Sequence, residues 1–167
     1  MGTIQKAQPV KLIAGFIFKD QDALSGSLFL LNKAFGKTDY ESPPLAFTHT
    51  SYYSEEFGDG LRKKFISFKK LVSPERLCRI KIFTNKIEKK FSLGANRLIN
   101  IDPGYLDMAK LVLASTKNYN HRIYLDKGIF AEITLTYKNK SFIPWQWTYP
   151  DYSSPDYISV FNRIRDI

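Results

Sequence analysis

The sequence predicts a single α+β domain, residues 1–167, with a mostly antiparallel or mixed sheet and about four helices packed on it. Three observations support this prediction. The length of 167 residues suits one domain. Segments with apolar residues at helical spacing alternate with short apolar segments of strand length. The last three strand-like segments follow one another through short turns, which is typical of antiparallel pairing.

The first elements are expected to be a buried strand, a helix and an edge segment. Residues 11–18 form an apolar run of strand length. A helix is expected over 20–35 and ends at Gly36. Residues 39–48 are expected to be extended at a sheet edge because they contain two prolines, and residues 51–60 are expected to form a loop. The apolar face of the helix comprises Ala23, Leu24, Leu28, Leu31 and Phe35.

A second helix is expected after a strand at 61–71. Ser73-Pro74 provides a capping residue followed by proline at the first helical position. Most basic residues of this helix fall outside its apolar face. A short strand at 98–101 follows, and Asp102-Pro103-Gly104 is expected to turn the chain into a third helix at 105–116. The apolar face of the second helix comprises Leu77, Ile80, Phe83, Ile87 and Phe91.

Three strands at 121–125, 129–138 and 142–148 are expected to form a meander, and a final helix begins at Ser154-Pro155. The alternation of side chains predicts the register of the first hairpin. A three-residue loop, 126–128, would pair the two residues that flank it. A slip by one residue would mix the polar and apolar faces, so it is rejected. The predicted cross-strand pairs are Leu125 with Ile129, Tyr124 with Phe130, and Arg122 with Glu132.

This register gathers Arg122, Glu132, Thr134 and Gln146 on one face, with Tyr124 beside them. The face is either the floor of a ligand pocket or a solvated surface with a cross-strand ion pair. In a pocket, the Arg122 guanidinium would bind an anion and the Glu132 carboxylate would accept hydrogen bonds or act as a base. The ligand expected there is a small phosphorylated or nucleotide-like molecule.

Three further segments are candidates for the same site. His121 would act as a general acid or base if it faces a cleft, and is otherwise structural. The turn at Asp102, with Tyr105 after it, has free backbone N–H groups that would bind an anion, unless Asp102 is a simple helix cap. Tyr149 lies in an aromatic loop, 147–152, which either stacks on a base or sugar or packs on the sheet.

The positive charge of the chain is concentrated in one segment. The net charge is +9, and residues 62–90 contain eleven basic and two acidic residues, which give a local charge of +9. This segment is either a solvated surface or a site for an anionic macromolecule such as RNA. An RNA-associated module is therefore the alternative function, beside a non-catalytic protein-interaction domain. Its binding residues would be Lys63, Lys64, Lys69, Lys70, Arg79 and Lys86.

Several familiar sites are excluded by their motifs. Gly36-Lys37-Thr38 resembles the end of a P-loop, but Leu31 stands where the first glycine is required. The histidines and the single Cys78 match no zinc pattern and no dinucleotide fingerprint occurs, so the sequence names no metal-binding residue and the cofactor is unknown. A Mg²⁺ held by one or two carboxylates and the substrate stays open. One cysteine excludes an internal disulfide, which favours a cytoplasmic protein. No apolar stretch has the length of a membrane-spanning helix.

The chain resembles the prokaryotic family catalogued as domain of unknown function 4416. The resemblance covers nearly the whole sequence and implies no established activity or catalytic residues. Some members carry a GTP-binding label, from which this sequence departs because it lacks a P-loop. The segments that resemble the family are Pro9–Leu12, Tyr52-Tyr53 with Glu55, Phe83–Asn85, Asn100–Leu106, Lys110–Ala114, His121–Leu125 and Trp147–Tyr152.

Overall fold

One large antiparallel sheet organises the chain in the computed structural model, which describes residues 2–47, 60–94 and 96–167. The prediction of an α+β fold is confirmed. Two short strands, β5 (Ser92–Leu93) and β6 (Asn96–Arg97), form a separate pair. In spatial order the main sheet contains β11 (Ser141–Pro144), β10 (Ile129–Lys138), β8 (Lys110–Ser115), β7 (Ile99–Leu106), β1 (Lys11–Phe18), β4 (Arg62–Phe68) and β2 (Thr38–Glu41), with β9 (Ile123–Asp126) on β10 and β3 (Leu45–Ala46) on β4.

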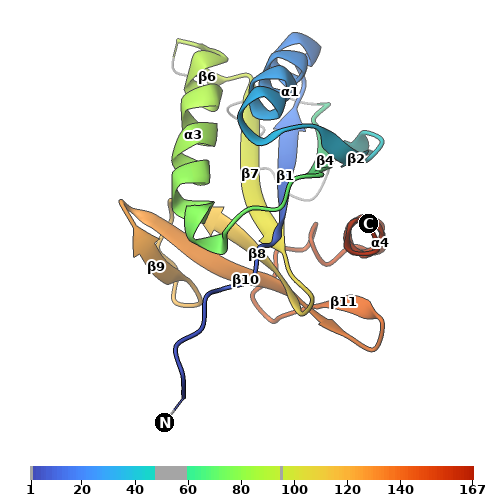
Figure 1. Cartoon of the computed structure of the whole chain (residues 1–167). Coiled ribbons are helices and arrows are strands. Elements are labelled where there is room, and N and C mark those ends of the chain that lie inside the picture. The colour runs from blue at the N-terminus through green and yellow to red at the C-terminus, as the bar shows by residue number, and fades with distance from the viewer. Residues whose placement is uncertain (1, 48–59, 95) are drawn as a thin grey trace.

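The helices cover both faces of this sheet (Figure 1). Helices α1 (Gln21–Phe35) and α3 (Leu77–Lys90) pack on one face, and α4 (Pro155–Arg165) packs on the other. Strand β1 contributes to both cores because its side chains alternate: Phe16 packs under α1 and α3, whereas Ile13 packs in the cluster of α4. Strand β1 is therefore buried on both faces.

Local signals explain where the helices begin. The Asp20 carboxylate accepts a hydrogen bond from the Ala23 N–H at the start of α1, and the Ser154 hydroxyl accepts one from the Tyr157 N–H at the start of α4. The expected Ser73-Pro74 start is shifted, because Pro74–Arg76 forms a short 3-10 turn before α3. The expected edge position of residues 39–48 is confirmed for β2, which ends the sheet; the loop expected at 51–60 lies outside the described residues except for Gly60.

The third helix expected at 105–116 is wrong. Strand β7 continues through Pro103-Gly104 to Leu106, and β8 follows, so the described residues contain three α-helices. Pro103 is tolerated because the N–H that proline lacks would point away from β1. On that side β8 does not pair with β7 at this position, so no ladder hydrogen bond is lost. The proline and glycine that resemble a turn therefore lie within a strand.

Gly104 marks the point where β7 and β8 meet. A methyl group at this position would collide with the carbonyl oxygen of Val112 on β8. We expect Gly104→Ala to lower the free energy of unfolding by about 2 kcal/mol, since the backbone of one strand must shift to relieve the overlap. Urea unfolding would measure the loss. Gly2→Ala, where no atom lies within 4 Å of the added carbon, is the control; equal stability of the two variants would contradict the prediction.

The sheet divides where β7 and β8 separate. Residues 104–106 of β7 pair with residues 111–113 of β8, but residues 99–103 pair with β1 alone. Side chains of α3 occupy the open edge: the Ile101 N–H donates to Glu88 Oε1 at 2.6 Å, and Lys81 Nζ donates to the Ile101 carbonyl oxygen at 2.9 Å. Two charged side chains thus take the place of a neighbouring strand.

The register of the β9–β10 hairpin is partly as predicted. Tyr124 lies opposite Phe130, as expected, and their rings meet edge to face at 5.3 Å. The pairing of Leu125 with Ile129 is wrong, because the turn has two residues, Lys127-Gly128, both with positive φ, and Asp126 lies opposite Ile129. A bulge next to the turn restores the predicted register.

Candidate functional site

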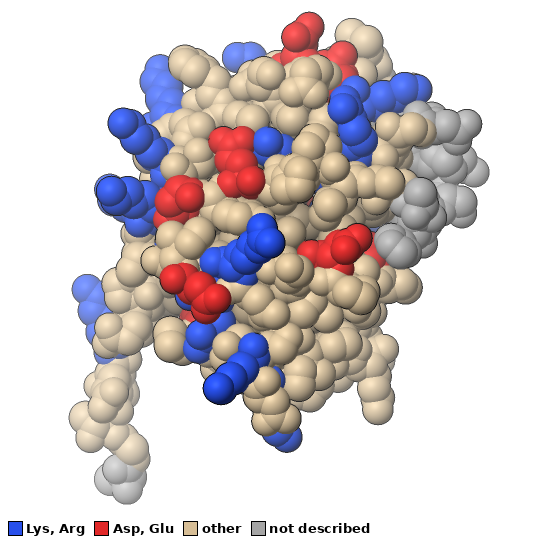
Figure 2. All heavy atoms as spheres, turned by 90° about the vertical axis from the view of Figure 1, so that its right-hand side faces the viewer, with Lys and Arg blue, Asp and Glu red and all other residues tan. Residues whose placement is uncertain are grey.

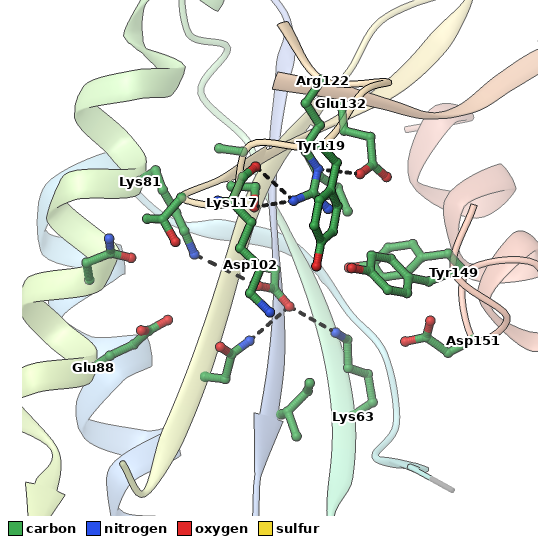
Figure 3. A pocket seen from close by; sticks show the side chains of 18 of the residues that line it. Lys63, Lys81, Glu88, Asp102, Lys117, Tyr119, Arg122, Glu132, Tyr149 and Asp151 are labelled. Atoms are coloured by element: carbon green, nitrogen blue, oxygen red, sulfur yellow. Dashed lines mark hydrogen bonds and ion pairs between the residues drawn. The ribbon is translucent and has the colours of Figure 1, made fainter. Parts of the chain in front are cut away.

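The divided sheet opens into a cavity of about 500 Å³ (Figure 3). Its lining comes mainly from α3, β4, the open end of β7, the end of β8 and the segments 116–122 and 149–152. Strands β1, β6 and β10 contribute one residue each, and Phe47 also lines it. Cavities of 300–1,000 Å³ are typical of small-molecule sites. The walls combine buried charged side chains with tyrosines.

Lys63 is the most deeply buried charge in the cavity. The residue is 1% exposed, and its ammonium nitrogen lies 3.3 Å from Asp102 Oδ2. Aromatic rings surround the rest of the ammonium, with the centroids of Tyr152 at 5.2 Å and Phe65 at 5.4 Å. Asp102 is its one carboxylate partner in the described chain.

Asp102 is shared by two lysines. Lys81, which is 6% exposed, places its ammonium nitrogen 3.9 Å from Asp102 Oδ1, and the Asn100 amide donates to Oδ2 at 2.9 Å. Burial alone would raise the pKa of Asp102. The ammonium groups of Lys63 and Lys81, together with the Asn100 amide, outweigh burial and hold the pKa of Asp102 below its ordinary value.

This lowered pKa predicts a contribution of Asp102 to acid stability. The folded state favours the ionised carboxylate, so the contribution is present above the ordinary pKa near 3.8 and disappears as the pH falls through the lower folded value. We expect Asp102→Asn to make the free energy of unfolding less dependent on pH below about pH 4. Urea unfolding at pH 7, 5, 4 and 3 would measure this. Parallel pH profiles for the two proteins would contradict it.

Arg122 forms the opposite wall and is held by strand β10, as the predicted register requires. Its Nε donates to Glu132 Oε2 at 2.8 Å, while Nη1 donates to Ser115 Oγ at 2.8 Å and to the Lys117 carbonyl oxygen at 3.0 Å. The side chain is 4% exposed. The N–H groups of Nη2 find no acceptor among the described residues, and Arg122 lines the cavity.

Glu132 is fully engaged in holding this arginine. Besides Arg122, its carboxylate lies 3.0 Å from His121 Nε2 and accepts a hydrogen bond from Thr134 Oγ1 at 3.1 Å. The His121 ring in turn stacks on Trp147, with the centroids 5.6 Å apart. These contacts suit a role for Glu132 in positioning Arg122, and the catalytic roles of Glu132 and His121 remain predictions.

The structure brings four of the expected ligand-binding or catalytic residues to one cavity and leaves others elsewhere. His121 contacts Glu132 behind the wall. Tyr105 lines a separate cavity beside the N-terminal segment. Gln146 is exposed because β11 ends at Pro144, before the residue that was expected in a strand. Tyr124 is exposed and packs on Phe130. The four that line the cavity are Asp102, Arg122, Glu132 and Tyr149.

The expected anion-binding turn at Asp102 is wrong. This residue lies inside β7, where it pairs with Gly15 of β1, so no helix start offers free N–H groups. Asp102 reaches the cavity through its carboxylate instead.

The sequence carried signals for the residues that were missed. Lys63 alternates with Leu61 and Phe65 on a buried face, and polar residues at helical spacing form a buried row on α3, namely Lys81, Thr84 and Glu88.

The basic segment is divided between the interior and the surface. Lys63 is buried in the cavity, and Lys64 pairs with Glu41 at 2.9 Å. On the face that carries β2 and α4, basic and acidic side chains are interspersed (Figure 2). No helix in the described residues is long and apolar enough to cross a membrane. The other four residues of the expected RNA site, Lys69, Lys70, Arg79 and Lys86, are exposed.

Within the described residues, no group of three or more His, Cys, Asp or Glu side chains is placed to hold a metal ion. Comparison with known proteins gives one match. The family model described as Domain of unknown function (DUF4416) matches residues 8–167, which is nearly the whole chain. No curated protein and no solved structure matches the chain.

Proposed function

Because the chain belongs to the DUF4416 family, whose description names no activity, we propose its function from the cavity: the protein binds a small phosphorylated ligand between the divided strands. One observation supports this proposal above the others. Three buried cations, Lys63, Lys81 and Arg122, line the same cavity and have unused hydrogen-bond donors.

The donors can be counted from the contacts. Each lysine ammonium has three N–H groups and donates one hydrogen bond within the described chain, while Arg122 has two free N–H groups on Nη2. Buried donors without acceptors are unfavourable. A phosphate group provides several acceptor oxygens for these donors, and its negative charge strengthens the hydrogen bonds.

Two tyrosines make a nucleotide-like ligand suitable within this class. Tyr119 and Tyr149 line the cavity, and both are exposed at its opening. Aromatic rings at such positions stack on bases or pack against sugar rings. The phosphate would then lie inward, near the lysines, and the remainder of the ligand near the opening.

Titration calorimetry with inorganic phosphate and with AMP tests the proposal. We expect both to bind the wild-type protein, and Lys81→Met to weaken both by about tenfold, since one charge-assisted hydrogen bond contributes roughly 1.5 kcal/mol. Lys86→Met is the matched control, because Lys86 lies exposed on the same helix. It should bind both probes as the wild type does.

The same variants distinguish the alternative function. A short single-stranded RNA would bind an RNA module with strong salt dependence, and Lys86→Met would weaken it while Lys81→Met would not. If this pattern is found and neither phosphate nor AMP binds, the proposed function is wrong and the basic surface is the functional site.

A further inference from the structure

One carboxylate in the cavity has no partner. Asp151 lines the cavity and is 8% exposed, yet its carboxylate makes no hydrogen bond and no ion pair within the described chain. Buried carboxylates are normally paired or hydrogen-bonded, because burying an acceptor without a donor is unfavourable. Asp151 is therefore a buried acceptor that faces a cavity.

The backbone around Asp151 holds it in this position. The Ser154 N–H donates to the Asp151 carbonyl oxygen at 3.1 Å, and the Ser153 N–H donates to the Tyr149 carbonyl oxygen at 3.1 Å. The neighbouring Tyr152 ring stacks on Phe161 of α4, with the centroids 5.8 Å apart. This loop is thus anchored to α4, and Figure 3 shows Asp151 directed into the cavity.

The nearby donors do not satisfy Asp151. Figure 3 shows the Lys63 ammonium between Asp102 and Asp151, but its ion pair is with Asp102. Burial raises the pKa of the Tyr157 phenol, and the negative charge of the nearby Asp151 raises it further. Even so, the buried Tyr157 hydroxyl has no hydrogen-bond partner among the described residues. Asp151 lines the cavity and its oxygens are not among the fully enclosed unpartnered atoms, so water or a ligand in the cavity can supply the donor.

We propose that the ligand is a phosphorylated sugar, free or as part of a nucleotide, whose hydroxyl groups donate to Asp151. This inference rests on the proposed function, which places the phosphate near Lys63 and Lys81. A second phosphate beside Asp151 would be repelled, whereas two neighbouring hydroxyls match the two carboxylate oxygens. The apolar face of the sugar would pack against Tyr149, two residues before Asp151 in the same loop.

Calorimetry with inorganic phosphate, ribose 5-phosphate and AMP tests this assignment. We expect the wild type to bind ribose 5-phosphate about tenfold more tightly than phosphate. Asp151→Ala should remove this difference without lowering phosphate affinity, because it takes away an acceptor and a negative charge but no donor to the phosphate, and Asp151→Asn, which keeps one acceptor oxygen, should have an intermediate effect. Tyr157→Phe is the control, since it removes the neighbouring hydroxyl without altering the cavity lining, and it should behave as the wild type.

The outcomes separate the two proposals. If phosphate binds but ribose 5-phosphate binds no more tightly, or if Asp151→Ala changes the affinity for all probes equally, the sugar assignment is overturned and the anion site stands. If no probe binds, the proposed function itself fails. Equal binding of ribose 5-phosphate and AMP would identify a free sugar phosphate, and tighter binding of AMP would identify a nucleotide. Thermal melts of each variant show whether it is folded.

Discussion

Lys63→Met is expected to lower the free energy of unfolding by about 3 kcal/mol and to weaken phosphate binding by about a hundredfold. Methionine fills the space of the lysine stem among the surrounding aromatic rings, so packing is largely kept. The Asp102 carboxylate, however, loses the ammonium at 3.3 Å and keeps the more distant one of Lys81 at 3.9 Å. Removing one member of a buried pair leaves the other charge insufficiently neutralised.

Chemical unfolding and calorimetry with phosphate would measure both effects. Lys64→Met is the control, because the neighbouring lysine pairs with a partly exposed glutamate, Glu41, and surface pairs contribute about 0–1 kcal/mol. The double variant Lys63→Met/Asp102→Asn should recover much of the lost stability but none of the binding, since the buried carboxylate charge is removed together with its partner. A stable Lys63→Met that binds phosphate normally would show that the ion pair has neither role.

Glu132→Ala is expected to lower the free energy of unfolding by about 4 kcal/mol. Glu132 is the carboxylate partner of the buried Arg122 and also contacts His121 and Thr134. Alanine would leave the guanidinium charge buried with neutral acceptors alone. Phosphate binding should weaken as well, because the freed guanidinium loses its fixed orientation.

Glu132→Gln is the informative companion variant. It keeps an oxygen acceptor for Arg122 Nε and the shape of the side chain, so its loss of stability should be less than half that of Glu132→Ala. Arg122→Met/Glu132→Ala should be more stable than Glu132→Ala, since both buried charges are removed. If the double variant is the less stable of the two, the arginine does not need the glutamate. Urea unfolding at neutral pH measures all three.

Local rules predicted those parts of the fold that depend on neighbouring residues. Apolar residues at helical spacing located the first helix and Ser154-Pro155 the start of the last. Side-chain alternation along two strands correctly placed Arg122 beside Glu132. The same reasoning failed at Pro103-Gly104, because these residues also suit a strand: proline where one side is unpaired, and glycine where the next strand approaches closely. Which of the two forms depends on where β8 begins to pair.

The cavity depends on contacts between distant parts of the chain, which local patterns do not specify. Lys63 and Asp102 are separated by 39 positions in the sequence. Their strands, β4 and β7, both pair with β1, which brings the two side chains together across that strand. Asp151 reaches the same cavity from a loop whose path is determined by packing on α4. Strand order, which decides these meetings, was not predicted. Lys63 was consequently assigned to a basic surface, although its alternation with Leu61 and Phe65 indicated burial.

The open edge of β7 has a consequence for solubility. A strand edge with unpaired N–H and C=O groups is a template for strands of other molecules and a common start of aggregation. On β7 the Lys81 and Glu88 side chains occupy the groups of Ile101 and place two charges along this edge. A strand from another copy would have to displace both charged groups and bury them without partners, so the divided sheet keeps an interior opening without exposing an aggregation-prone edge.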